Sequence, residues 1–198
     1  MNGAVPRRPL ILGIGGAGPA SSSEQALMIA LAAAESMGAR TRLFGGAAMA
    51  ELPPYLAPEC RDHPQALSLI ACVREASGFV LASPGYHGTV SGIFKNAIDY
   101  VEETARDERA YFHDRPVGLI AVASGWQAAG TTLTTLRTIA HALRGWPTPF
   151  GATIQSRSAL FSGGACEDPD VSEQLRRIAV QVTGGINNDR QQEVVQVP

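Results

Sequence analysis

The chain has 198 residues, of which 45% are hydrophobic, and its 16 lysines and arginines against 18 aspartates and glutamates give a formal net charge of −2. This composition is that of one globular domain and argues against a disordered or fibrous protein. With no basic stripe and no apolar run near the roughly 20 residues that span a bilayer, the sequence predicts neither a nucleic-acid nor a membrane partner. Three cysteines without a CxxC pair indicate no disulfide framework, which favours the cytoplasm.

Short apolar runs alternate with segments of helical periodicity along the chain. The runs predict strands at 10–14, 40–44, 79–82, 117–123 and 151–155. The periodic segments predict helices within 27–38, 67–78, 94–101, 133–143 and 171–182. The fourth run is apolar throughout and predicts a central strand, whereas the polar fifth run predicts an edge strand. Because each right-handed crossover lays its helix on the sheet, this alternation predicts a parallel sheet covered on both faces.

Two internal segments and the C-terminal tail interrupt this alternation. Residues 45–64 contain four prolines and are predicted to run over the surface at the carboxyl edge of the second strand. The charged segment 103–115 is interpreted as a solvated helix end and loop, with a subunit contact or a lid as the alternative. The polar tail 184–198 has no helical stripe, so we expect it to be disordered or to pack on a partner subunit. The prediction is a single domain over 1–198 with its core at about 9–183.

Three loops rich in small residues follow predicted strands, at the edge where open parallel sheets bind ligands. In the first loop, 13–24, serine hydroxyls and helix N-terminal amides can hold a phosphate, or the serines 21–23 can simply cap the helix. The second loop, 83–92, offers a flat wall to a planar ring. The third loop, 124–130, offers amide donors to negative charge on a heterocycle. Together they predict one shared ligand.

The second loop and the helix after it carry a specific motif. The segment SPGYHGTVSGIFKNAID, residues 83–99, resembles the pattern T/S-P-x-Y-x-x-x-x-x-G-x-L-K-N-A-I-D of the NADPH-dependent FMN reductases, a flavodoxin-like family that includes flavin, quinone and azo reductases. Residues 124–130 and 136–138 also resemble this family, so the similarity covers about 10–182. It implies an α/β flavodoxin-like three-layer sandwich, with a five-stranded parallel sheet in the order 2-1-3-4-5 and helices on both faces.

The same resemblance implies the site residues. The first loop would hold the FMN phosphate through Gly15, Ala17, Ser21, Ser22 and Ser23. The second and third loops would hold the isoalloxazine ring through Pro84, Gly85, Tyr86, His87, Gly88, Ser124, Gly125, Trp126, Gln127 and Gly130.

Roles for individual side chains stay open between two interpretations. No side chain is expected to be an obligatory catalyst, although His87 could hydrogen-bond the flavin or protonate a product, or be a polar loop residue. Trp126 could stack on nicotinamide or cover the core. Lys95 and Asp99 are predicted to be a surface ion pair on one helix. The histidines show no metal-ligand spacing, so no metal is predicted.

The first loop departs from the family pattern G-x-S-G-S-x-R-x-x-S. This chain has Gly15, Ala17 and Pro19 where the family has serine, serine and arginine, and Ser22 alone clearly matches. Losing a cation and two hydroxyls removes charge-assisted bonds worth on the order of 1.5 to 3 kcal/mol each. This loss predicts a reductase that takes flavin up, reduces it and releases it.

The predicted function is therefore an NAD(P)H-dependent FMN reductase that passes hydride from NADPH or NADH to flavin N5 and supplies reduced flavin to a partner monooxygenase. One alternative is an FMN-bound quinone, azo or xenobiotic reductase, and another is a non-catalytic flavin-binding or scaffold protein with a degenerate phosphate loop. The resemblance also implies a homodimer or homotetramer. Candidate contact surfaces are the helix 93–101, the segment 103–115 and an exposed turn at 146–150.

Overall fold

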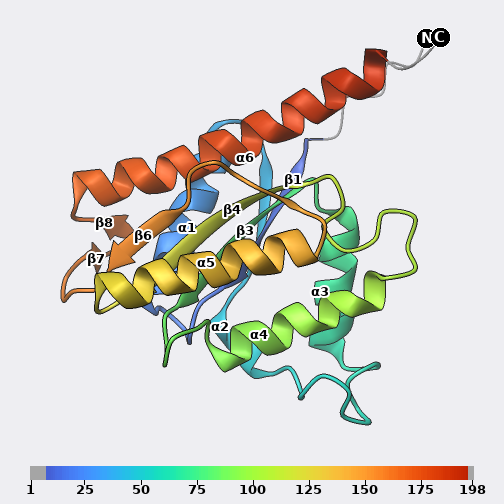
Figure 1. Ribbon diagram of the computed structural model, residues 1–198, viewed down its shortest axis with the longest axis horizontal. Helices are drawn as coiled ribbons and strands as arrows, with labels where there is room; N and C mark the ends of the chain where they lie inside the picture. The colour runs from blue at the N-terminus through green and yellow to red at the C-terminus, as the bar shows by residue number, and fades with distance from the viewer. Residues whose placement is uncertain (1–7, 196–198) are drawn as a thin grey trace.

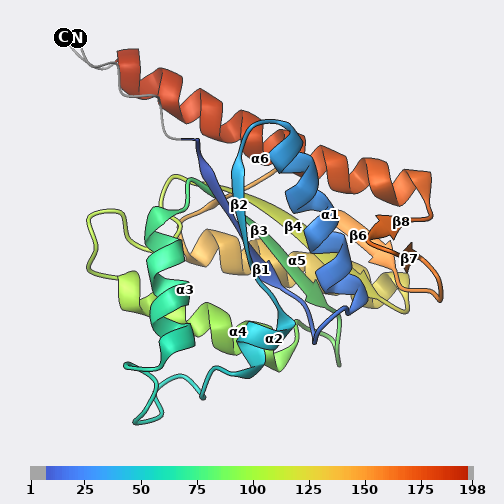
Figure 2. The same ribbon diagram turned by 180° about the vertical axis from the view of Figure 1, so that it is seen from behind.

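A parallel sheet lies between two layers of helices in the computed structural model, which describes residues 8–195 and the side chains of residues 8–187 (Figures 1 and 2). Four strands follow one another in the order β2-β1-β3-β4, and β5 and β6 share the place beyond β4. Their bounds are β1 (Leu10–Gly15), β2 (Arg40–Phe44), β3 (Gly78–Pro84), β4 (Pro116–Ala123), β5 (Trp146–Pro147) and β6 (Ala152–Gln155). All pairings within this sheet are parallel, and the predicted order 2-1-3-4-5 is confirmed.

The helices cover both faces of the sheet, as predicted. Two of them, α1 (Ser22–Ser36) and α6 (Pro169–Val195), lie on one face (Figure 2). The other face carries α3 (Pro64–Glu75), α4 (Gly92–Asp99) and α5 (Trp126–Ala142) (Figure 1). The short helices α2 (Gly46–Ala50) and η1 (Tyr100–Thr104) lie in the connections, and β7 (Phe161–Ser162) pairs antiparallel with β8 (Ala165–Cys166).

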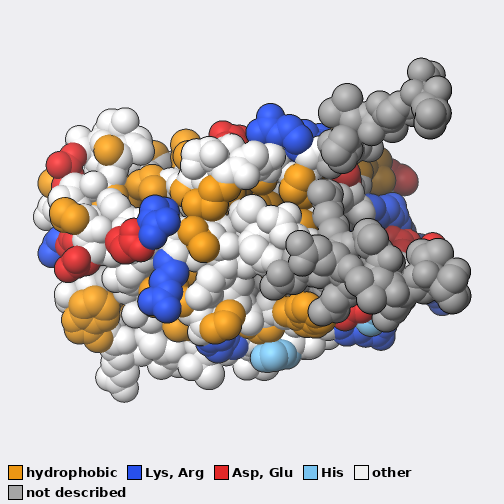
Figure 3. Space-filling model, turned by 90° about the horizontal axis from the view of Figure 1, so that it is seen from above, with side chains coloured by type: hydrophobic (Ala, Val, Ile, Leu, Met, Phe, Trp, Pro, Cys, Tyr) orange, Lys and Arg blue, Asp and Glu red, His pale blue; other side chains and the backbone are white. Residues whose placement is uncertain are grey.

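The two cores follow from the period of two in the strands, because successive side chains point to opposite faces. On β4, Leu119 belongs to the core under α3, α4 and α5, whereas Ile120 belongs to the core under α1 and α6. The strands β1, β3 and β4 are buried along their whole length, which explains their uniformly apolar runs. No described helix is long and apolar enough to cross a membrane. The face above α6 mixes acidic, basic and apolar side chains (Figure 3).

The outer strand is interrupted rather than continuous. Pro147 pairs with Val117, but Ala152 pairs with Ile120, so the edge strand has two more residues than β4 between these pairs. The prediction of an exposed turn at 146–150 is therefore wrong: the first two residues form β5, and Phe150 is half-buried under the Arg177 guanidinium, 4.8 Å from its ring. Trp146 does remain 48% exposed. An edge position tolerates Pro147, which has no N–H to donate.

The last helix is longer than the sequence pattern indicates. It continues through residues 184–195, so the expectation of a disordered tail is wrong there, whereas packing on a partner subunit stays a prediction, and residues 196–198 lie outside the described part. Packing overrides the low helix propensity of the two glycines. Ile186 is 3% exposed and lies over Gly78, and a side-chain carbon on Gly185 would come within 2.9 Å of Pro116. Both contacts require the helix to continue at close range.

In the second half of the segment 103–115 the residues 110, 112 and 115 are buried, so the favoured interpretation of a solvated loop is wrong there. Phe112 is fully buried and stacks on Phe79 at 4.0 Å between ring centroids. Arg115 is 1% exposed and donates to the carbonyl oxygens of Val73 at 2.6 Å and Ala76 at 3.2 Å. It thereby caps the carbonyl end of α3. Burial lowers the pKa of Arg115 to about 10.

We expect Arg115→Met to destabilise the fold by about 3 kcal/mol, because the buried carbonyl oxygens of α3 lose their donor. Urea unfolding followed by circular dichroism measures this change. The matched control is Arg74→Met on α3 itself. Arg74 forms an exposed ion pair with Asp107 at 2.8 Å, so its removal should lower the free energy of unfolding by less than about 1 kcal/mol. Equal losses in the two variants would contradict the capping role of Arg115.

Candidate functional site

The three predicted loops meet at one cavity of about 260 Å³ at the carboxyl edge of the sheet. Its walls come from the loop after β1, the start of α1, the ends of β3 and β4 with the residues that follow them, and the residue after β6. They are formed by Ala17, Ser21, Ser22, Ser23, Pro84, Gly85, Tyr86, Val122, Ala123, Ser124 and Ser156. Ser156 was missed by the sequence analysis, although it follows the last strand directly. Its hydroxyl lies 3.4 Å from that of Ser22.

The first loop is organised by the serine that caps α1. The Ser21 hydroxyl accepts from the Ala17 amide at 3.0 Å and from the Glu24 amide at 3.4 Å. The amides of Ser22 and Ser23 begin the helix, where helical geometry supplies no intrahelical acceptor. Ser21 therefore caps the helix, which confirms one of the two interpretations, whereas the phosphate-holding role of Ser22 and Ser23 stays a prediction. Gly15 lies outside the cavity lining, against Ala82, where a side chain would not fit.

A buried carboxylate lies behind this loop. Glu24 is 7% exposed, and its two oxygens accept from the amides of Ala20 at 2.6 Å and Gly46 at 2.7 Å. Glu24 was not among the predicted site residues, although its spacing from Ser21 is that of a capping box. No lysine or arginine is among the described residues that line the cavity.

The second loop ends in a tight two-residue turn. Tyr86 and Thr89 exchange both backbone hydrogen bonds, at 2.9 and 3.0 Å, and His87 and Gly88 between them have φ of 49° and 89°. Two positive φ values in succession are those of a type I′ turn. Ser83 closes the base of the loop by accepting from the Ser91 amide at 3.0 Å. This turn places His87 and Gly88 at an exposed tip outside the cavity lining, whereas Tyr86 lines the cavity and is 51% exposed.

The third loop is shorter than predicted, because α5 already begins at Trp126. The N-cap residue is Gly125, which makes no side-chain hydrogen bond to the helix. The first backbone N–H groups of α5 therefore remain available to donate to a ligand. Trp126 is 61% exposed, which excludes the interpretation that it covers the core. Gln127 is exposed in the same first turn. Gly130 lies one turn later and lines a shallow hollow with threonines of α5 instead.

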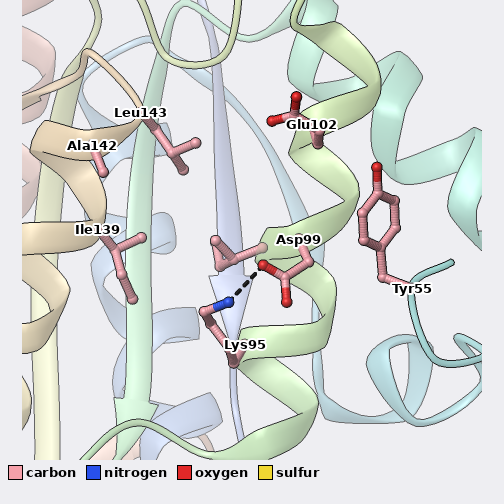
Figure 4. A pocket seen from close by; sticks show the side chains of 8 residues that line it. Tyr55, Lys95, Asp99, Glu102, Ile139, Ala142 and Leu143 are labelled. Atoms are coloured by element: carbon pink, nitrogen blue, oxygen red, sulfur yellow. Dashed lines mark hydrogen bonds and ion pairs between the residues drawn. The ribbon is translucent and has the colours of Figure 1, made fainter.

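The helical half of the motif has an architectural role. Asn96 accepts from the Tyr55 amide at 2.8 Å and donates to the Pro53 carbonyl oxygen at 3.0 Å, which fixes the proline-rich connection onto α4. Lys95 and Asp99 form the predicted surface pair at 2.6 Å. They border a second cavity of about 320 Å³, opposite α5 (Figure 4). Burial and a hydrogen bond to Glu103 raise the pKa of Tyr55, on its rim, to about 12.

Similarity to known proteins agrees with this geometry. Two curated relatives are FMN-dependent NADPH-azoreductases, from Staphylococcus saprophyticus, 46% identical over 76 residues, and from Staphylococcus aureus, 37% identical over 116 residues. These matches cover 38% and 57% of this chain and 37% and 58% of the relatives, so the chain spans only about half the length of the curated relatives it matches.

Solved structures show the same fold. FerB, a flavoenzyme NAD(P)H:(acceptor) oxidoreductase from Paracoccus denitrificans, superposes with a TM-score of 0.73 at 18% identity, over 91% of this chain and 98% of that one. An NADH:FMN oxidoreductase, EMOB, gives a TM-score of 0.71 at 18% identity, over 91% and 89%. The model of the family described as NADPH-dependent FMN reductase matches residues 9–157. With most of its length matched by that model, the chain belongs to the NADPH-dependent FMN reductase family.

Proposed function

We propose that this protein is an NAD(P)H-dependent flavin reductase that binds FMN in the cavity at the carboxyl edge of the sheet. The observation that carries the proposal is the arrangement of two helix N-termini around this one cavity. The serines at the start of α1 lie on one side, and Ser124, just before the uncapped start of α5, lies on another. Between them Pro84, Gly85 and Tyr86 form a wall suited to a planar ring.

The donors fit the two ends of a flavin mononucleotide. Hydroxyls of Ser22, Ser23 and Ser156 would hold the phosphate end. The amides that open α5 would donate to the pyrimidine edge of the ring and stabilise negative charge there. A bound flavin supplies two-electron chemistry, taking hydride from nicotinamide and passing electrons to an acceptor. The cavity is slightly smaller than typical ligand sites of about 300 to 1,000 Å³, so part of the ligand would extend over exposed Tyr86 and Trp126.

The protein's own contribution is binding and orientation rather than acid or base chemistry. The Glu24 carboxylate, next in sequence to the cavity-lining Ser23, is occupied by two amides, and His87 lies at the exposed turn tip. A cavity without a lysine or arginine in its described lining holds a phosphate weakly, which suits a reductase that releases reduced flavin to a partner monooxygenase. Its three cysteines are free, in keeping with the reducing cytoplasm as its location.

A second candidate function, an azoreductase that keeps its FMN, is favoured by the names of the curated relatives. The exposed Tyr86 and Trp126 would offer a planar azo compound an aromatic surface. Dialysis separates the candidates. A releasing reductase loses its flavin and oxidises NADPH only when FMN is added, whereas the azoreductase stays yellow and reduces an azo dye without free flavin.

We expect Ser124→Trp to raise the Kd for FMN at least about tenfold, because Ser124 is exposed and lines the cavity, so the indole would fill the space of the ring. Quenching of flavin fluorescence during titration measures the Kd. Ser36→Trp, at an exposed serine at the far end of α1, should leave the Kd unchanged. If folded Ser124→Trp binds FMN as the unmodified protein does, the site lies elsewhere.

We also propose that the protein is a homo-oligomer whose subunits meet at the second cavity described above, which forms a groove between α4 and α5 (Figure 4). The groove combines apolar Ile139 and Leu143 with both signs of charge, on Lys95, Asp99 and Glu102, as a self-complementary contact requires.

Light scattering is expected to give a mass of at least about twice the 20.8 kDa chain mass. Ala142→Glu places a charge on an exposed position in the groove and should lower this mass to that of one chain, while Ala32→Glu on the exposed face of α1 should not. A fully active monomer at every concentration would refute the proposed assembly.

A further inference from the structure

The amides around the first loop are already largely occupied by the chain itself. The Ala17 amide donates to the Ser21 hydroxyl at 3.0 Å. The Ala20 and Gly46 amides donate to the two carboxylate oxygens of Glu24, at 2.6 and 2.7 Å. These are the kind of donors, at a loop and a helix N-terminus, that otherwise hold a ligand phosphate. In this protein two of them hold an internal anion, the Glu24 carboxylate, and the third holds a serine hydroxyl.

The position of this anion is fixed by close packing. Glu24 is 7% exposed, and two glycines leave room for it. A side-chain carbon on Gly45 would lie 2.2 Å from the Glu24 Oε1 atom, and one on Gly16 would lie 3.2 Å from the Glu24 Cβ atom. Both oxygens are hydrogen-bonded and the side chain is enclosed, so these contacts favour the carboxylate staying in place when a second anion binds.

The carboxylate also weakens the attraction of α1 for anions. The N-terminus of a helix carries a partial positive charge of about half a unit, and an acidic side chain in the first turn offsets it. Glu24 lies in that first turn, directly after the cavity-lining Ser22 and Ser23. Among the described lining residues no lysine or arginine compensates. A phosphate at these serines would find hydroxyl and amide donors together with a fixed like charge.

We propose that Glu24 makes the flavin site nearly indifferent to the 5′-phosphate, so that its substrates are ribityl flavins with or without the phosphate, riboflavin as well as FMN. This inference rests on the proposed function and names the substrate class of that same site. Glu24 acts here as a specificity-determining residue through its charge. A purely structural role, as an anchor of the loop, makes the opposite prediction for its removal.

The test is a pair of fluorescence titrations, with riboflavin and with FMN, at low ionic strength. In the unmodified protein the two Kd values should differ by about tenfold or less. Glu24→Gln removes the charge at nearly constant size and gives up one of the two amide hydrogen bonds, because its NH2 group cannot accept. It should tighten FMN by roughly fivefold or more, while riboflavin changes by less than about twofold. A loop anchor predicts weaker FMN binding instead, because the phosphate donors lose their positions.

Two matched variants separate charge from shape. Glu24→Asp keeps the charge but shortens the side chain, so its ratio of riboflavin to FMN affinity should stay close to that of the unmodified protein. Glu35→Gln, at an exposed position near the other end of α1, changes the net charge equally and should leave the ratio unchanged.

A measurement on the unmodified protein keeps the proposal testable even if Glu24→Gln does not fold. Salt screens repulsion, so FMN should bind more tightly relative to riboflavin as ionic strength rises. The proposal is overturned if salt weakens FMN relative to riboflavin, if Glu24→Gln weakens FMN, or if the unmodified protein prefers FMN by more than about a hundredfold. Failure to bind either flavin would overturn the proposed function as well, which distinguishes the two failures.

Discussion

The parallel pairing of β1, β3 and β4 is the constraint on which the site depends. Parallel strands end at the same edge of a sheet, so the loops that follow these strands must converge there, however far apart they lie in the chain. Burial of all three strands fixes their register, because a one-residue slip would move every side chain to the other core. The cavity at that edge is therefore held by the buried centre of the sheet.

Two helix N-termini near this cavity differ in what they can offer a ligand. At α1 the cap residue Ser21 and the buried Glu24 already take up loop amides. At α5 the cap residue is Gly125, which makes no side-chain hydrogen bond. The first N–H groups of that helix and the positive end of its dipole therefore remain available to a ligand. The arrangement favours negative charge at the ring end of the site more than at the phosphate end. Such a balance suits a flavin that is reduced in place and then released.

The parallel sheet and the convergence of the loops could be predicted from the sequence, because they follow from apolar runs such as 117–123 that alternate with helical segments. The strand order was implied by the family resemblance of one motif. The roles of Glu24 and Arg115 could not, because each depends on backbone groups from distant segments: the Gly46 amide for Glu24, and carbonyl oxygens of α3 for Arg115. The helical tail was missed for a related reason, since its glycines are held in the helix by packing on the sheet. Local patterns report periodicity and caps, whereas these features arise from tertiary contacts.

A crystal structure of the protein soaked with FMN tests the central claim most directly. The account predicts the isoalloxazine ring against Pro84 to Tyr86, with its pyrimidine edge toward the first amides of α5 and its phosphate at Ser22, Ser23 and Ser156. Flavin bound elsewhere, for example in the groove between α4 and α5, with the cavity at the sheet edge left empty, would contradict it.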